Sequence, residues 1–331
     1  MKSDPRAGVC AHGARRWLPV LGIAAAAAAF QWGCSAVGMG ASQRDFATPE
    51  QAAAALAAAA RADDPSRMLD VLGPDGEKLV QSGDPVADHE GRQRFVKAYD
   101  TAHRIELQGA GTAAVVIGPE NWPLPIPLVK SGERWHFDTA ASAQKILDRR
   151  VGRNELNVIE VCRAYVAAQR EYASVDRLGD GLHEYARHFE SSPGKHDGLH
   201  WDSEAGAQES PLGPLVVKAR AEGYGAESGF HPAPYHGYFY RILTRQGPHA
   251  PAGARDYVVN GHMTGGFALL AIPARWGDSG IMTFIVNQDG IVFQKNLGPD
   301  TDSAARAIDE YDPDSSWTVV PETPAPRAPA S

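Results

Sequence analysis

The chain has 331 residues, of which 43% are hydrophobic and 22% are charged, as in a globular protein. This length is sufficient for two domains of ordinary size. The formal net charge is −8 and the basic residues form no cluster, which excludes a typical nucleic-acid-binding protein. The three cysteines, Cys10, Cys34 and Cys162, lie far apart in the sequence, so they indicate neither a disulfide framework nor a zinc site.

The N-terminal leader is predicted to be a secretory signal peptide of the lipoprotein type. Arg15 and Arg16 precede an apolar segment over 17–30, which is the order of a signal peptide. A small residue directly before Cys34 resembles the bacterial lipobox, although Gln31 stands where lipoboxes usually have Leu. The resemblance implies cleavage before Cys34 and lipidation of this cysteine.

Lipidation of Cys34 would hold the protein on a bacterial membrane, because more than one acyl chain gives stable anchoring. Ser35 resembles the signal that sorts lipoproteins to the outer membrane, which implies the periplasmic side of that membrane. Without lipidation, the leader predicts a periplasmic or secreted protein. Arg15 and Arg16 also resemble a twin-arginine export signal, but their neighbours match that signal poorly.

Composition and periodicity divide the chain into five predicted parts. They are the leader (1–33), a small-residue tether (34–45), an N-terminal α+β domain (46–150), a C-terminal α+β domain (151–320) and a proline-rich disordered tail (321–331).

The N-terminal domain is predicted to contain helices followed by an antiparallel meander, which is an α+β order. The expected elements are a helix opened by Thr48 and Pro49, helices over 65–72 and 88–105, and strands over 112–117, 124–129 and 134–138. This order resembles a cone-like fold of the nuclear-transport-factor-2 type. The resemblance implies either a core filled by side chains or a cavity with inward polar groups such as Tyr99, His103 or His136.

The C-terminal domain is predicted to pack a helix on an antiparallel sheet. A helical connector over 139–150 ends at Gly152, and Asn154 is expected to cap a second helix through Ala173 that buries Cys162. The other expected elements are strands over 237–243, 257–259 and 267–272, a hairpin of 281–286 and 291–294, and short helices over 181–189 and 303–311.

Seven motifs recur in one bacterial family. They are Trp122–Val129, Gly132–Thr139, Gly152–Leu156, Ala168–Tyr172, Tyr235–Tyr240, Thr264–Phe267 and Gly280–Asn287. On these motifs, the chain resembles the uncharacterised secreted family catalogued as domain of unknown function 2950, from Phe46 to Val320. The family has no assigned activity, so the resemblance implies no catalytic residue.

The C-terminal half also resembles the head domains of type IV pilins and pseudopilins. Ala168–Tyr172, Gly237–Tyr240, Pro273–Gly280 and Phe284–Gly290 follow the order of helix, strand, turn and hairpin in those heads. Pilins carry a long apolar helix directly before the head, whereas this chain has a polar domain there. The resemblance therefore implies the head fold and not filament assembly through that helix.

His196, His200 and Asp202 are the metal-ligand candidates of the sequence. Residues four apart share one face of a helix, as two metal-binding histidines require. Pro193 and the neighbouring glycines disfavour a helix, and His196 is not followed by the Glu of metalloproteases. A solvated polar loop is therefore the preferred interpretation, and the sequence predicts no cofactor.

An aromatic group surrounds the predicted sheet and consists of Tyr235, Tyr238, Tyr240 and Trp276. Aromatic residues are enriched at binding sites, so this group is a candidate interaction surface. Alternation along a strand would instead place about half of them in the core. The sequence leaves both interpretations open.

Residues 277–280 read Gly-Asp-Ser-Gly, as around the nucleophile of trypsin-like proteases. A serine nucleophile requires an oriented histidine and an oxyanion hole. Here Ile281 follows in place of the glycine, and a turn that leads into a strand explains both glycines. The turn is the preferred interpretation.

Together, these features favour an exported, lipid-anchored envelope protein that acts as a non-catalytic binding module with an envelope protein as partner. One alternative is a small-ligand binder or enzyme that uses a cavity in the N-terminal domain. The other is a metal-dependent hydrolase that uses His196, His200 and Asp202.

The substitution Cys34→Ala tests the lipoprotein prediction. Cells that express the chain and are fed radiolabelled palmitate should label the unchanged chain and the Cys162→Ala variant, whereas Cys34→Ala should abolish the label because no acyl acceptor is left. Labelling of Cys34→Ala at the unchanged level would contradict the prediction.

Overall fold

The computed structural model describes residues 43–202, 209–224 and 233–321. The leader, Cys34 and nearly all of the predicted tether and tail lie outside these residues. Among the described residues, no helix has both the length and the apolar character needed to cross a membrane.

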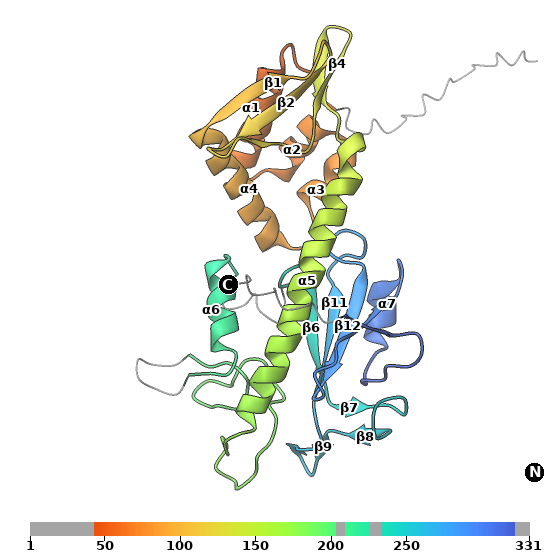
Figure 1. Cartoon of the computed structure of the whole chain (residues 1–331). Coiled ribbons are helices and arrows are strands. Elements are labelled where there is room, and N and C mark those ends of the chain that lie inside the picture. The colour runs from red at the N-terminus through yellow and green to blue at the C-terminus, as the bar shows by residue number, and fades with distance from the viewer. Residues whose placement is uncertain (1–42, 203–208, 225–232, 322–331) are drawn as a thin grey trace, which may run out of the picture. The chain divides into compact units, whose positions relative to one another are not determined.

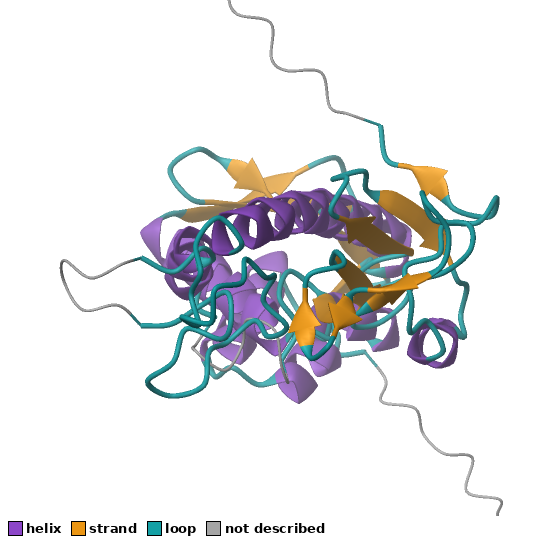
Figure 2. Ribbon diagram, turned by 90° about the horizontal axis from the view of Figure 1, so that it is seen from below, coloured by secondary structure: helices purple, strands orange, loops and turns teal. Residues whose placement is uncertain are grey.

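The described part of the chain contains both helices and antiparallel strands. The helical elements are α1 Pro49–Arg61, α2 Pro65–Leu72, η1 Pro74–Gly76 (a 3₁₀ turn), α3 Glu77–Val80, α4 Pro85–Thr101, α5 Ala140–Tyr172, α6 Gly213–Ala221 and α7 Thr301–Arg306. The strands are β1 His103–Leu107, β2 Thr112–Ile117, β3 Trp122–Pro123, β4 Leu128–Ser131, β5 Arg134–Phe137, β6 Tyr238–Leu243, β7 Arg245–Gln246, β8 Arg255–Asp256, β9 Val258–Val259, β10 His262–Met263, β11 Ala268–Pro273, β12 Met282–Asn287, β13 Phe293–Asn296 and β14 Thr318–Val319. The predicted α+β class is confirmed, and loops make up much of the remainder (Figure 2).

A first hydrophobic core lies between helices α1–α4 and an antiparallel sheet of order β1-β2-β4-β5, in which β3 also pairs with β2. Thr48 caps α1 by accepting the Gln51 N–H at 3.3 Å, as its sequence predicts. The buried alanines of α1 allow close packing against α2 and α4. Leu56, Tyr99 and Phe137 belong to this core.

Helix α4 begins and ends earlier than the predicted range of 88–105. Asp84 caps it, Pro85 is its first residue, and it ends at Thr101. Residues 103–107 form β1 instead, where Ile105 pairs with Val115 of β2. Strand pairing thus outweighs the helical periodicity at the end of this segment.

A single helix of 33 residues, α5, replaces the predicted connector and its separate successor. Gly152 does not interrupt α5, because residues on both sides of it, such as Val151 and Val158, are buried and hold the helix in place by packing. Asn154 therefore caps no helix, and its Nδ2 donates to the Ser279 carbonyl at 2.9 Å. The predicted domain boundary at 150–151 falls inside α5 and stays a prediction.

Helix α5 contacts α3 and lies across β11 and β12 (Figure 1). These strands belong to a five-stranded antiparallel sheet of order β14-β13-β12-β11-β6. The predicted hairpin is confirmed as β12 and β13, with Met282 opposite Asn296. The second core lies between α5 and this sheet. The helix predicted over 181–189 is wrong, since this segment is irregular, and α7 ends at Arg306.

A buried carboxylate, Asp84, joins the N-terminal helices to the C-terminal segment. Asp84 is 1% exposed, and its Oδ1 caps α4 by accepting the Ala87 N–H at 3.0 Å. Its Oδ2 accepts the Tyr224 O–H and the Gly237 N–H, each at 2.8 Å. Gly237 has φ +76°, and a Cβ there would lie 2.7 Å from Asn154 Nδ2, so only glycine fits.

Asp84→Ala should lower the free energy of unfolding by about 3–5 kcal/mol, because it removes a helix cap and leaves two buried donors without an acceptor. Asp64→Ala is the matched control. Asp64 caps α2 by accepting the Ser66 and Arg67 N–H groups, but it is partly exposed and makes no long-range contact of this kind. The control should lose about 1 kcal/mol. Urea unfolding followed by circular dichroism measures both, and equal losses would contradict the role of Asp84.

Candidate functional site

A cavity of about 580 Å³ lies between α4, α5 and the segment that joins β3 to β4. Its volume falls within the range of about 300–1,000 Å³ that is typical of small-molecule sites. Part of the lining is apolar and adjoins the first core. These side chains are Leu56, Met68, Leu72, Phe95, Leu124, Ile126 and Phe137.

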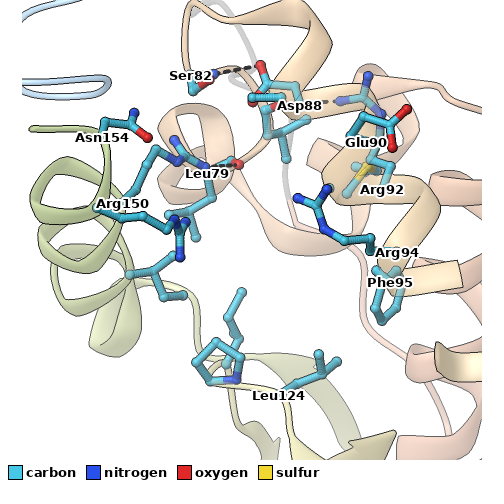
Figure 3. Close-up of a pocket in the computed structure, with 18 of the residues that line it drawn as sticks. Leu79, Ser82, Asp88, Glu90, Arg92, Arg94, Phe95, Leu124, Arg150 and Asn154 are labelled. Atoms are coloured by element: carbon cyan, nitrogen blue, oxygen red, sulfur yellow. Dashed lines mark hydrogen bonds between the residues drawn. The ribbon is translucent and has the colours of Figure 1, made fainter. Parts of the chain in front are cut away.

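The remainder of the lining contains a polar group that we call the arginine rim. It consists of Asp88, Glu90, Arg92 and Arg94 on α4, and Arg150, Arg153, Asn154 and Asn157 on α5. The α5 residues are three or four positions apart, so they share one face of this helix. Figure 3 shows Arg92 and Arg94 across the cavity from Arg150 and Asn154, with Leu124 at the apolar end.

Two of the rim arginines are engaged within the protein. Arg92 forms an ion pair with Asp63. Arg150 donates to the main-chain carbonyls of Lys78 and Leu79 at 2.6 and 2.7 Å. These contacts hold both side chains in place and connect α5 to the end of α3.

The other two rim arginines, Arg94 and Arg153, are exposed and have no hydrogen bond or ion pair with any described residue. Guanidinium groups bind carboxylates and phosphates through two parallel hydrogen bonds. The two side chains therefore present free donors beside an apolar cavity. An anionic group of a ligand would satisfy them.

The deeper part of the rim is shielded from solvent. Burial lowers the pKa of Arg150, and the neighbouring Asp88 carboxylate opposes this effect. Burial raises the pKa of Asp88, although its carboxylate accepts the Ser82 N–H at 2.8 Å. Both shifts have the sign that desolvation gives to a charged group.

His236 and Tyr224 line the cavity from the C-terminal segment. Burial, followed by the charge of Lys218, lowers the pKa of His236 to about 4, so its ring is neutral at pH 7. Nδ1 of this neutral ring lies 3.3 Å from Asn157 Nδ2, at hydrogen-bonding distance. This wall of the cavity therefore offers polar contacts without a positive charge on the imidazole.

The polar groups that the sequence suggested for a cavity are not among its lining residues. Tyr99 stacks on His103 with ring centroids 3.9 Å apart and is 8% exposed. His136 Nδ1 lies 3.5 Å from an Asp45 carboxylate oxygen. A cavity in contact with the first core is present, but α4 and α5 supply its polar residues.

The candidate interaction surface is corrected to core for three of its four residues. Tyr235 is 1% exposed, and Tyr238 and Tyr240 are 0% exposed. Each hydroxyl has a partner within the protein, which lets the ring be buried. Trp276 is half-buried, and its indole N–H donates to Asn296 at 3.0 Å.

The metal candidates His196, His200 and Asp202 do not form a group of neighbouring ligand atoms. His196 stacks on a tryptophan ring, His200 Nδ1 lies 2.8 Å from Glu190, and Asp202 pairs with Arg220 at 3.2 Å. Each side chain thus has a separate partner. The structure therefore does not bring these three weak candidates together as metal ligands.

Two side chains with nucleophilic atoms are buried. Ser279 of the Gly-Asp-Ser-Gly segment is 0% exposed, and its hydroxyl bonds to the N–H and C=O of Arg275 at 2.9 and 3.1 Å. This is the predicted turn before β12. Cys162 is also 0% exposed, and burial raises the pKa of its thiol to about 12. Cys162 is therefore a core residue, as predicted.

Residues 43–320 match the family described as protein of unknown function (DUF2950). The chain belongs to this family. No curated protein and no solved structure matches the chain. The predicted membership is confirmed, whereas the likenesses to pilin heads and to cones of the nuclear-transport-factor-2 type stay predictions.

The arginine rim of this DUF2950 member was not predicted from its sequence. Arg150, Arg153, Asn154 and Asn157 have helical spacing, so a signal was present. It was obscured by the predicted break at Gly152, which divided these residues between two helices. For Arg94 on α4 the sequence gives no such signal, because the cavity that it faces is built by segments far apart in the chain.

Proposed function

We propose that this chain binds a small amphipathic ligand in the cavity. The apolar body of the ligand packs against residues such as Leu56, Phe95 and Leu124. An anionic group contacts Arg94 and Arg153 at the arginine rim. The supporting observation is that the guanidinium groups of Arg94 and Arg153 have no partner among the described residues and lie beside the apolar part of the cavity.

Two energetic terms support this ligand class. Burial of apolar surface contributes about 25 cal/mol per Å² removed from water. An ion pair with an exposed guanidinium group contributes about 0.2–1 kcal/mol, and more where the cavity shields the pair from water. An apolar ligand without an anionic group would use only the first term, and a small polar anion would use only the second.

We propose binding rather than catalysis as the role of the cavity. Asp88, the rim carboxylate with a raised pKa, already accepts the Ser82 N–H. Ser279 and Cys162 are both fully buried. Among the charged rim groups, Arg94, Arg153 and the half-buried Glu90 have no partner within the described residues. The two guanidinium groups recognise anions and do not transfer protons near neutral pH.

The predicted signal peptide indicates where in the cell this ligand would be bound. Export and lipidation of Cys34 would place the cavity on the periplasmic side of the outer membrane, or in the periplasm if Cys34 is not lipidated. Amphipathic anions are abundant components of bacterial envelopes. A protein of the envelope that delivers or receives the ligand would be the partner.

Dodecanoate and dodecan-1-ol form a matched pair of probes, since they differ in the anionic group. Isothermal titration of the purified chain should show tighter binding of dodecanoate. The double variant Arg94→Gln/Arg153→Gln should weaken dodecanoate binding about tenfold or more, because charge-assisted hydrogen bonds are lost. Its affinity for dodecan-1-ol should not change. Arg187→Gln, at an exposed arginine outside the cavity, is the control.

A second variant tests the location of the site. Gly91 lines the cavity, and a Cβ there would meet only Arg94 Nη2, at 3.8 Å. A Cβ is accommodated there, so Gly91→Leu should occupy part of the cavity and should favour helix α4, because glycine is a poor helix former. It should weaken the binding of both probes. Unchanged binding of dodecanoate by Gly91→Leu would show that the cavity is not the site.

A further inference from the structure

A second cluster of polar side chains lies away from the cavity, where the loop after α5 meets the hairpin of β9 and β10. It contains Asp180 and Glu184 from the loop and His262 from β10. One candidate ligand atom from each residue lies within 4.8 Å of the other two. Among the described residues, this is the one group of three His, Cys, Asp or Glu side chains with that spacing.

The backbone fixes this arrangement. Both carboxylate oxygens of Asp176 accept loop N–H groups, from Gly179 at 2.7 Å and from Gly181 at 2.8 Å. The loop is then held against the hairpin, because the Tyr185 N–H donates to the Met263 carbonyl at 2.9 Å. The three side chains therefore meet on a supported segment.

Two distances within the cluster are close to those between ligands around a small cation. His262 Nδ1 lies 3.4 Å from Glu184 Oε2 and 3.6 Å from Asp180 Oδ2. Direct N–H···O hydrogen bonds are shorter, at about 2.7–3.2 Å. Four ligand atoms placed tetrahedrally at about 2.0–2.1 Å from Zn²⁺ lie about 3.3–3.4 Å from one another.

The Glu184 carboxylate is buried, and only one of its two oxygens has a hydrogen-bond partner among the described residues. The side chain of Glu184 is 9% exposed, and its Oε1 has no hydrogen-bond partner among the described residues. A buried carboxylate oxygen without a partner is costly, and a bound cation removes that cost. Glu184 Oε2 accepts the Met263 N–H at 3.1 Å. Asp180 Oδ1 accepts the Leu182 N–H at 3.0 Å. Such outer contacts orient metal ligands.

We infer that Asp180, Glu184 and His262 bind one divalent transition-metal ion, with Zn²⁺ as the best-suited species. One imidazole and two carboxylates form a ligand set that Zn²⁺ accepts, whereas Ca²⁺ and Mg²⁺ prefer oxygen ligands alone. The side chains of Asp180 and His262 are 33% and 35% exposed, so a fourth position is open to water. The ion would fasten the loop after α5 to the β9–β10 hairpin. This inference does not depend on the proposed ligand in the cavity.

Zinc titration of the purified, metal-stripped full chain tests the inference. Isothermal titration calorimetry with ZnCl₂ should show one site per chain. Glu184→Gln and His262→Gln should each weaken this binding at least tenfold, because each removes one ligand. His249→Gln is the matched control, since His249 also pairs with a carboxylate, Asp312 at 2.7 Å, but has no third ligand beside it. The control should bind Zn²⁺ like the unchanged chain.

A thermal melt separates the loss of metal from the loss of fold. Without metal, Glu184→Gln should melt at the same temperature as the unchanged chain or at a higher one, because its amide removes a buried charge. Only the unchanged chain and His249→Gln should melt at a higher temperature when Zn²⁺ is added. The absence of stoichiometric Zn²⁺ binding, equal binding by all variants, or preference for Ca²⁺ over Zn²⁺ would each overturn the inference.

Discussion

The buried carboxylate of Asp84 is the constraint on which the arrangement of the cavity depends. It caps α4, which supplies one wall of the cavity. It also accepts hydrogen bonds from the Tyr224 hydroxyl and the Gly237 N–H of the C-terminal segment. A buried carboxylate is tolerated only when donors surround it, and here three N–H or O–H groups do so. Because two of these donors, on Tyr224 and Gly237, come from sequence positions more than a hundred residues from α4, a single side chain fixes the distance between two walls of the cavity.

Helix α5 extends this constraint to the second sheet. Asn154 Nδ2 donates to the Ser279 carbonyl, and Glu155 Oε1 accepts the N–H groups of Ile281 and Met282 at 3.0 and 2.9 Å. A Cβ at Gly280 would lie 2.0 Å from the Tyr238 hydroxyl oxygen, so glycine is required there. Asn154, Glu155 and Gly280 in these sequence motifs therefore have a structural role, which is to join α5 to the second sheet. The side chains that are free to bind a ligand lie on the adjacent turns of α5 and across the cavity on α4.

Local signals predicted much of the fold, and contacts between distant segments account for most of the rest. Thr48 before Pro49 predicted the start of α1, and two β-branched runs around a turn predicted the hairpin of β12 and β13. Gly152 suggested a helix break, but glycine is tolerated inside a helix that packing holds on both sides. The proposed zinc ligands could not be predicted, because Glu184 binds the backbone 79 residues further along the chain. The burial of Tyr235, Tyr238 and Tyr240 could not be predicted either, because it depends on packing in the second core.

Native mass spectrometry can show whether the cavity holds an anionic amphiphile. The full chain would be produced with its leader in a bacterium and purified from the envelope under mild conditions. We expect a complex with one amphiphile per chain, identified as a carboxylate or phosphate after extraction, and a smaller amount of this complex for Gly91→Leu. A chain without bound amphiphile, or the same amount of amphiphile on Gly91→Leu, would show that the cavity is not a site for an anionic amphiphile.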